Sequence, residues 1–132
     1  MGLVLVVEPG HYALAQLASD APVPRWLPTS GFVSVTRAAD ELSIICAQEA
    51  VPADIRQQGG WRLIRFVGPF PFTVTGVLSS VLEPLAAAGV SIIATSTFNT
   101  DYLLVPADAL DTAETALRAA GHEVRSTPLS QS

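Results

Sequence analysis

Two short segments in the second half of the chain carry the residues whose types and spacing could bind a small molecule. The first is a glycine- and proline-containing stretch, residues 68–74, that leads into a predicted helix, so its backbone amides would favour a carboxylate. The second offers hydroxyl groups and one anion, from Ser96, Thr97, Thr100 and Asp101. An edge that attracts anions beside one that attracts cations suits a free amino acid, which carries both charges.

Composition removes several other kinds of chemistry. The basic residues number 7 and all are arginine, which excludes a lysine nucleophile and a phosphate-binding loop that ends in lysine. The net charge of −5 makes a nucleic acid an unlikely partner. Cys46, His11 and His122 are too few for a zinc or iron–sulfur site within one chain, so no cofactor is expected. We expect Cys46 to be a buried apolar residue and both histidines to lie at the surface.

The apolar content points to a partner. Charged residues make up only 14% of the chain, against the usual share of about 25%, so we expect a homodimer that covers apolar surface. No apolar run approaches the roughly 20 residues of a membrane span, so no membrane partner is expected. The first apolar run stops at Glu8, too early for a secretory signal, and the single cysteine fits a cytoplasmic location.

The second half of the chain has the pattern of a ferredoxin-like unit. Apolar residues recur at helical spacing over residues 74–85, with Pro84 inside the helix and Gly89 suited to its end. Asp108 is a good N-cap for a second helix, over residues 109–120. Strands are expected at residues 62–67, 91–96, 102–106 and 122–125. The resulting order is βαββαβ.

The first half of the chain resembles the second at an offset of 60 residues, as in Leu3 and Leu63 or Pro9 and Pro69. We therefore predict a duplication, with units at residues 1–60 and 61–125 and a disordered tail at 126–132. In the first unit we expect strands at residues 3–7, 32–36 and 42–47 and helices at 12–19 and 52–58. Little room is left for its final strand, which is either missing or supplied by another segment. The predicted class is α+β, with antiparallel sheets and helices on one face.

The βαββαβ order brings the two polar segments together. Its first two strands run parallel, so the loop after one and the turn after the other lie at the same edge of the sheet. We expect residues 68–74 and 96–101 to be neighbours there.

The segment GPFPFTVTGVLSSVLEPLAAAGVSIIATSTFNTDYLLV resembles the ACT domain of aspartokinases and of CASTOR-type arginine sensors. DELSIICAQEAVP is similar to the strand and loop before the second ACT unit of small bacterial CASTOR-like proteins. The resemblance implies a tandem ACT pair: a non-catalytic regulatory module that binds an amino acid and controls a protein partner. It also places the ligand site on ten residues. They are Phe72, Thr73, Val74, Thr75, Gly76, Ser96, Thr97, Phe98, Thr100 and Asp101.

Asp101 decides which ligand is expected. The first loop lacks the carboxylate or amide that often holds the ligand amine in aspartokinases, so Asp101 is the remaining candidate for that role. An acidic group at the site, without an arginine, favours arginine or another cationic amino acid. Asp101 could instead simply cap the turn, as aspartates in turns usually do.

Two other functions remain open. The chain could be a protein-interaction module that has lost its ligand. It could also be a ferredoxin-like enzyme such as an acylphosphatase, but that chemistry needs an arginine in the phosphate loop, and residues 68–76 have none. We therefore expect no enzymatic activity.

Overall fold

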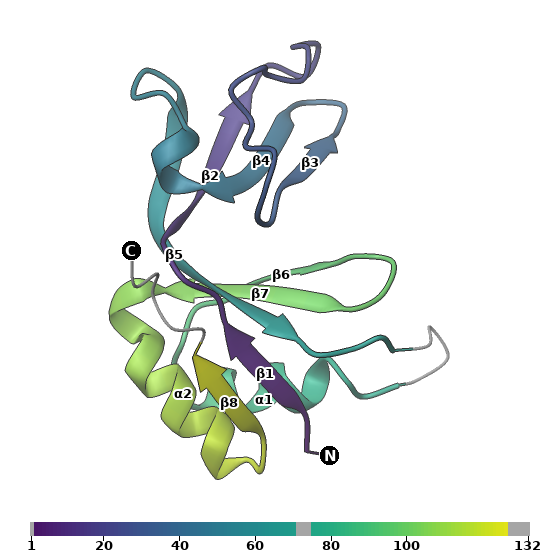
Figure 1. The fold of residues 1–132 in the computed structure, drawn as a ribbon, viewed down its shortest axis with the longest axis vertical. Helices are drawn as coiled ribbons and strands as arrows, with labels where there is room; N and C mark the ends of the chain where they lie inside the picture. The colour runs from purple at the N-terminus through teal and green to yellow at the C-terminus, as the bar shows by residue number, and fades with distance from the viewer. Residues whose placement is uncertain (1, 71–74, 127–132) are drawn as a thin grey trace. The chain divides into compact units, whose positions relative to one another are not determined.

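The computed structural model describes residues 2–70 and 75–126, which form two compact units. The helical unit consists of Met1–Pro9 and Arg62–Ser132, and the strand unit of Gly10–Trp61. Figure 1 shows the elements of each unit along the chain. The chain divides both after Pro9 and after Trp61, so residues 1–9 belong to the helical unit.

The helical unit has the predicted βαββαβ order. Its six elements are β5 (Arg56–Phe66), α1 (Ser79–Ala87), β6 (Ile93–Ser96), β7 (Asp101–Pro106), α2 (Leu110–Ala119) and β8 (Glu123–Ser126). Strand β7 pairs with both β5 and β6. Gly89, which follows the end of α1, has a φ of +75°, as its predicted place after the helix requires. This unit is a mixed α+β, ferredoxin-like fold.

One extra strand enters this sheet. Strand β1 (Val4–Val7) pairs antiparallel with β5, where Leu5 is opposite Phe66, and parallel with β8, where Leu5 is opposite Val124. The predicted duplication is therefore wrong in its central correspondence. Residues 3–7 and 63–67 do not hold equivalent places in two units, because the two strands pair with each other inside one.

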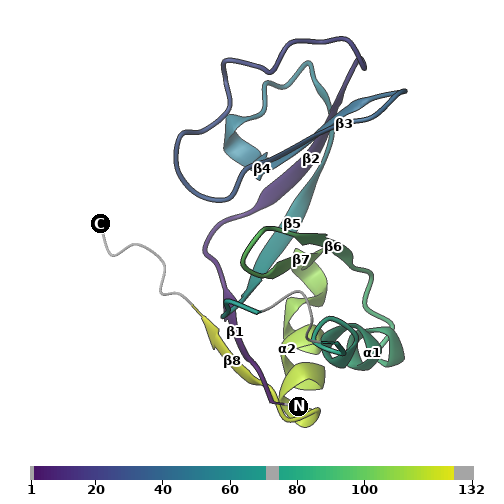
Figure 2. The same cartoon turned by 90° about the vertical axis from the view of Figure 1, so that its right-hand side faces the viewer.

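The helical unit encloses the larger core. Both helices cover the same face of its sheet (Figure 2), and α1 contributes Val81 and Leu85 while α2 contributes Ala113 and Leu117. Phe66 of β5 is fully buried between them and the neighbouring strands. Burial of each of the larger side chains, those of valine, leucine and phenylalanine, stabilises the fold by about 1.5–3 kcal/mol. Within the described residues, no helix is long and apolar enough to cross a membrane.

The strand unit contains no α-helix among its residues, so the ferredoxin-like order predicted for the first half of the chain is wrong. The strand unit contains β2 (Tyr12–Leu17), β3 (Ser34–Arg37) and β4 (Leu42–Ala47). Strand β4 pairs antiparallel with both β2 and β3, and β2 also pairs antiparallel with the first half of β5. The expected helix at residues 12–19 is β2. Its alanines favour a helix, but pairing on both sides overrides that preference.

The expected helix at residues 52–58 is also absent, since β5 begins at Arg56. Gly59 and Gly60 lie inside β5. Tyr12 is opposite Trp61 and Leu14 is opposite Gln58, so β5 has one more residue than β2 in this interval. That is a β-bulge, and Gly60 accommodates it with a φ of +82°. Strand β5 pairs with β2 through residues 56–61 and with β1 through residues 64–66.

Several local predictions need correction. Asp108 lies in a short 3₁₀ turn (Ala107–Ala109), and α2 begins without a side-chain cap. Ser126 belongs to β8, while residues 127–132 of the predicted tail lie outside the described part of the chain. His122 is buried, with 5% of its surface exposed, whereas His11 is exposed as predicted. Cys46 is fully buried, as predicted.

Candidate functional site

The loop after β5 lies against the turn between β6 and β7, as the topology predicts. The amide of Phe70 donates a hydrogen bond of 2.9 Å to the carbonyl of Asn99, and the hydroxyl of Thr100 donates one of 2.9 Å to the carbonyl of Phe66. Gly68 fits closely here, since a Cβ atom on it would lie 3.0 Å from the Cβ of Thr100. The two segments therefore form one edge of the helical unit.

The turn itself is closed by its own polar groups. The amide of Thr97 donates to the carbonyl of Thr100 over 2.8 Å, and the Thr97 hydroxyl contacts the same carbonyl at 3.2 Å. Across the strand pair, the hydroxyl of Ser96 donates to Oδ1 of Asp101 over 2.5 Å. Asp101 is thus bonded through its side chain to the residue opposite it at the base of the turn, and its half-buried carboxylate has a second oxygen, Oδ2.

The structure describes seven of the ten predicted ligand residues; Phe72, Thr73 and Val74 lie outside the described part. Ser96, Thr97 and Phe98 are exposed on the turn, and Phe98 has 82% of its surface accessible. Thr75 and Gly76 are exposed just before helix α1.

Helix α1 begins shortly after Thr75 and Gly76 in the sequence, and its first backbone amides lie at that end. Helical bonding begins when the Ser80 amide donates to the carbonyl of Gly76 over 3.0 Å. The hydroxyl of Ser79 donates a hydrogen bond to the carbonyl of Gly76, and the hydroxyl of Ser80 donates one to the carbonyl of Val77. Because the first amides of a helix have no partner within it, this end of α1 favours an anion.

A second group of polar side chains, in the strand unit, was missed from the sequence. Gln16, Ser43, Arg56 and Gln58 line a pocket of about 320 Å³. Residues 12–19 and 52–58 were both predicted to be helical, which hides the fact that these side chains share one face of a sheet. Residues 14–17 read Leu-Ala-Gln-Leu, which do not alternate between polar and apolar, so the local sequence offered no strand signal for this face.

Two protein families match the chain. The ACT domain family matches residues 57–119, which include most of the helical unit and both segments of the candidate site. A family described as an N-terminal domain matches residues 10–54, within the strand unit.

The curated relatives are arginine sensors. The human cytosolic arginine sensor for mTORC1 subunit 1 is 29% identical over 119 residues, which is 82% of this chain and 34% of the human protein. The sensor from Bos taurus is 33% identical over 85 residues, which is 61% of this chain and 24% of the cattle protein. The chain thus spans about one third of the length of these relatives at most.

Solved structures extend the similarity over the whole chain. The crystal structure of protein Atu0741 from Agrobacterium tumefaciens is 37% identical, with a TM-score of 0.93, and the match covers 100% of this chain and 98% of the other. The regulatory subunit of aspartate kinase from Thermus thermophilus shares the fold at 14% identity, with a TM-score of 0.56 over 88% and 95% of the two chains. The chain therefore belongs to the same family as the Agrobacterium protein, and its residues 57–119 match the ACT domain.

Proposed function

We propose that this protein is a non-catalytic regulatory module that binds a free amino acid at the edge formed by residues 68–76 and 96–101. The observation that carries the proposal is the close fit of Gly68 against Thr100, which brings the loop before α1 beside the turn that bears Asp101. The two opposite charges of a free amino acid each find a group of complementary charge at this edge. The α-carboxylate binds at the helix start, and the α-amino group or a cationic side chain binds Asp101.

A cationic amino acid, arginine first, is the proposed ligand. The acidic group of Asp101 lies on the turn, and the described residues of the two segments include no arginine. The 29% sequence identity with the human cytosolic arginine sensor supports arginine as the ligand and a cytoplasmic location.

Regulation requires that something respond to the ligand. We propose that two copies of the chain pair and that the ligand-bound dimer controls a partner protein. The low charged fraction of 14% supports pairing, because it leaves apolar surface to cover. The strand unit would take the place of the first domain of a tandem ACT pair, which the fold similarity to the aspartate kinase regulatory subunit over 88% of this chain supports.

The test is isothermal titration calorimetry with the standard amino acids, on the natural chain and two variants. Asp101→Asn removes the negative charge and keeps the shape of the side chain. Asp108→Asn makes the same change of charge at an exposed aspartate outside both segments, so it is the matched control. The proposal requires that Asp101→Asn weaken binding and that Asp108→Asn leave it unchanged.

A further inference from the structure

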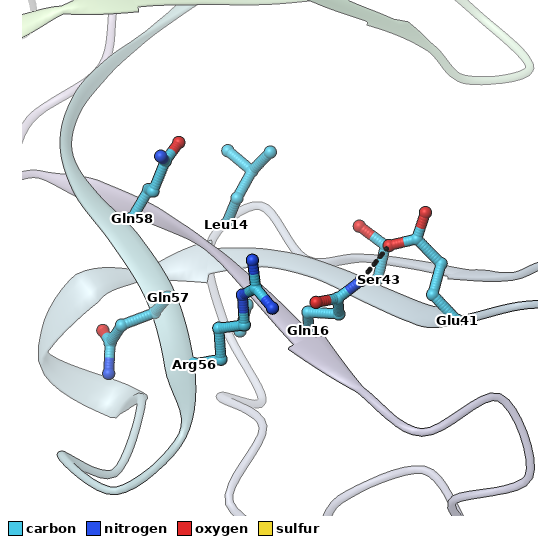
Figure 3. Close-up of a pocket in the computed structure, with 8 residues that line it drawn as sticks. Leu14, Gln16, Glu41, Ser43, Arg56, Gln57 and Gln58 are labelled. Atoms are coloured by element: carbon cyan, nitrogen blue, oxygen red, sulfur yellow. Dashed lines mark hydrogen bonds between the residues drawn. The ribbon is translucent and has the colours of Figure 1, made fainter.

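The open face of the strand unit holds a pocket built by the sheet register. Gln16 of β2 is opposite both Ser43 of β4 and Arg56 of β5, so the three residues form one row across the sheet. Leu14 and Gln58, opposite each other, start the next row on the same face. Successive residues of a strand alternate between faces, so these side chains project together from one surface. Figure 3 shows them around the pocket, whose volume is about 320 Å³.

The opposite face of this sheet is already filled. Ala13, Ala15, Ile44 and Cys46 form a core cluster, with Trp26 packed against it. The small core and the polar pocket therefore lie on opposite faces of the same strands. The pocket volume falls at the lower end of the range for small-molecule sites, which begins near 300 Å³.

Arg56 is the distinctive residue of the pocket. Its guanidinium is exposed and, like that of Arg25, makes no ion pair and donates no hydrogen bond to any residue that the structure describes, whereas the other five arginines all have such partners. A guanidinium presents a planar set of donors that matches a carboxylate in a two-bond geometry. An arginine without a partner inside a pocket is thus a ready site for a carboxylate.

The pocket also contains a negative charge. Oε1 of Glu41 accepts a hydrogen bond of 3.2 Å from the amide of Gln16, which orients this carboxylate toward the pocket (Figure 3). Gln16 and Ser43 lie between Arg56 and Glu41 in this view. A ligand with charges of both signs can pair with both Arg56 and Glu41, whereas a simple anion or a simple cation leaves one of these two side chains without an opposite charge.

We infer that this pocket binds a small zwitterion of amino-acid size, with its carboxylate on Arg56 and its ammonium group on Glu41. The amide of Gln58, in the next row, can bond a polar side chain of the ligand, and Leu14 supplies an apolar contact. The site is a second one, since it shares no residue with residues 68–76 and 96–101.

The experiment is calorimetry of the full chain with the standard amino acids, with succinate as an anion-only probe and 1,4-diaminobutane as a cation-only probe. Arg56→Gln removes the charge, while Arg25→Gln removes the charge of another exposed arginine of the strand unit and is the matched control. Loss of one charge-assisted bond predicts a roughly 10- to 150-fold weaker affinity in Arg56→Gln. Arg25→Gln should bind as the natural chain does, and both probes, whose charges are all of one sign, should bind far more weakly than the amino acid.

Asp101→Asn separates this site from the proposed regulatory one. Binding weakened by Arg56→Gln and unchanged by Asp101→Asn supports the pocket and contradicts the site at Asp101. Binding weakened by Asp101→Asn and unchanged by Arg56→Gln overturns the pocket and leaves the proposed function intact. Two binding events, each lost in one variant, support both sites, and the absence of any amino-acid binding overturns both.

Discussion

The amide of Leu3 donates a hydrogen bond of 3.1 Å to Nδ1 of His122, so a side chain near the end of the chain holds its first strand. Nε2 of the same ring lies 2.8 Å from the carbonyl of Ser80 in helix α1. Because Nδ1 accepts, the proton of the neutral ring belongs on Nε2, which donates to Ser80. The ring thus connects β1, α1 and the start of β8.

The first prediction concerns the stability of this connection. His122→Ala leaves the Leu3 amide and the Ser80 carbonyl without their partner, so it should lower the free energy of unfolding by about 2–4 kcal/mol. Urea denaturation followed by circular dichroism measures this. His11→Ala, at the exposed histidine, is the control and should change stability by no more than about 0.5 kcal/mol. Equal stability of the two variants would show that the ring contributes no net stabilisation.

The second prediction concerns the thiol. Burial raises the pKa of Cys46, and the negative charge of Glu49 raises it further. The folded chain should therefore react with a thiol reagent far more slowly than the urea-unfolded chain does. A reaction rate that is the same in both states would contradict the buried position.

The raised pKa of Cys46 also gives stability a pH dependence. The unfolded thiol ionises near pH 8.5, before the folded one, so ionisation favours the unfolded state. The contribution of Cys46 is fully present below about pH 8.5 and is lost as the pH rises through the folded-state pKa. Denaturation between pH 7 and 10 should show a steeper fall for the natural chain than for Cys46→Ala, and parallel profiles would refute this.

The third prediction concerns the close approach of loop and turn. In Gly68→Ala the new Cβ would lie 3.0 Å from the Cβ of Thr100 and 3.1 Å from the carbonyl oxygen of Asn99. Both neighbours belong to a tight turn, so the loop must shift, at a cost of about 1–3 kcal/mol. Denaturation gives the loss of stability, and calorimetry gives the accompanying loss of amino-acid affinity. If the alanine variant matches the natural chain in both measurements, the two segments are not packed as described.

The fourth prediction concerns assembly. Analytical ultracentrifugation at micromolar concentration should give twice the chain mass of 13.8 kDa. A sedimenting species with the mass of one chain across this range would contradict the proposed homodimer.

Local patterns predicted the helical unit because each of its elements carries its own signal. The helical spacing around Val81 and Leu85 and the turn residues after Ser96 are readable without knowledge of the rest of the chain. The adjacency of the loop and the turn followed from topology alone. For α1, β6, β7 and α2 the expected and observed elements therefore agree apart from their ends.

The strand unit was not predictable in the same way, because long-range pairing determines it. Ala13 and Ala15 favour a helix locally, and only their position between β4 and β5 makes them part of a strand. The place of β1 in the helical unit and the burial of His122 depend on contacts between opposite ends of the chain. Arg56 became a candidate only when the register aligned it with Gln16.

The most direct test of the central claim is the affinity of the natural chain and of Asp101→Asn for arginine, measured by calorimetry. The natural chain should bind, and the variant should bind roughly 10- to 150-fold more weakly, since it loses one charge-assisted hydrogen bond. Asp108→Asn, at an exposed aspartate outside the site, should retain the natural affinity. The absence of heat with every standard amino acid at millimolar concentration, or an unchanged affinity in Asp101→Asn, would contradict the account.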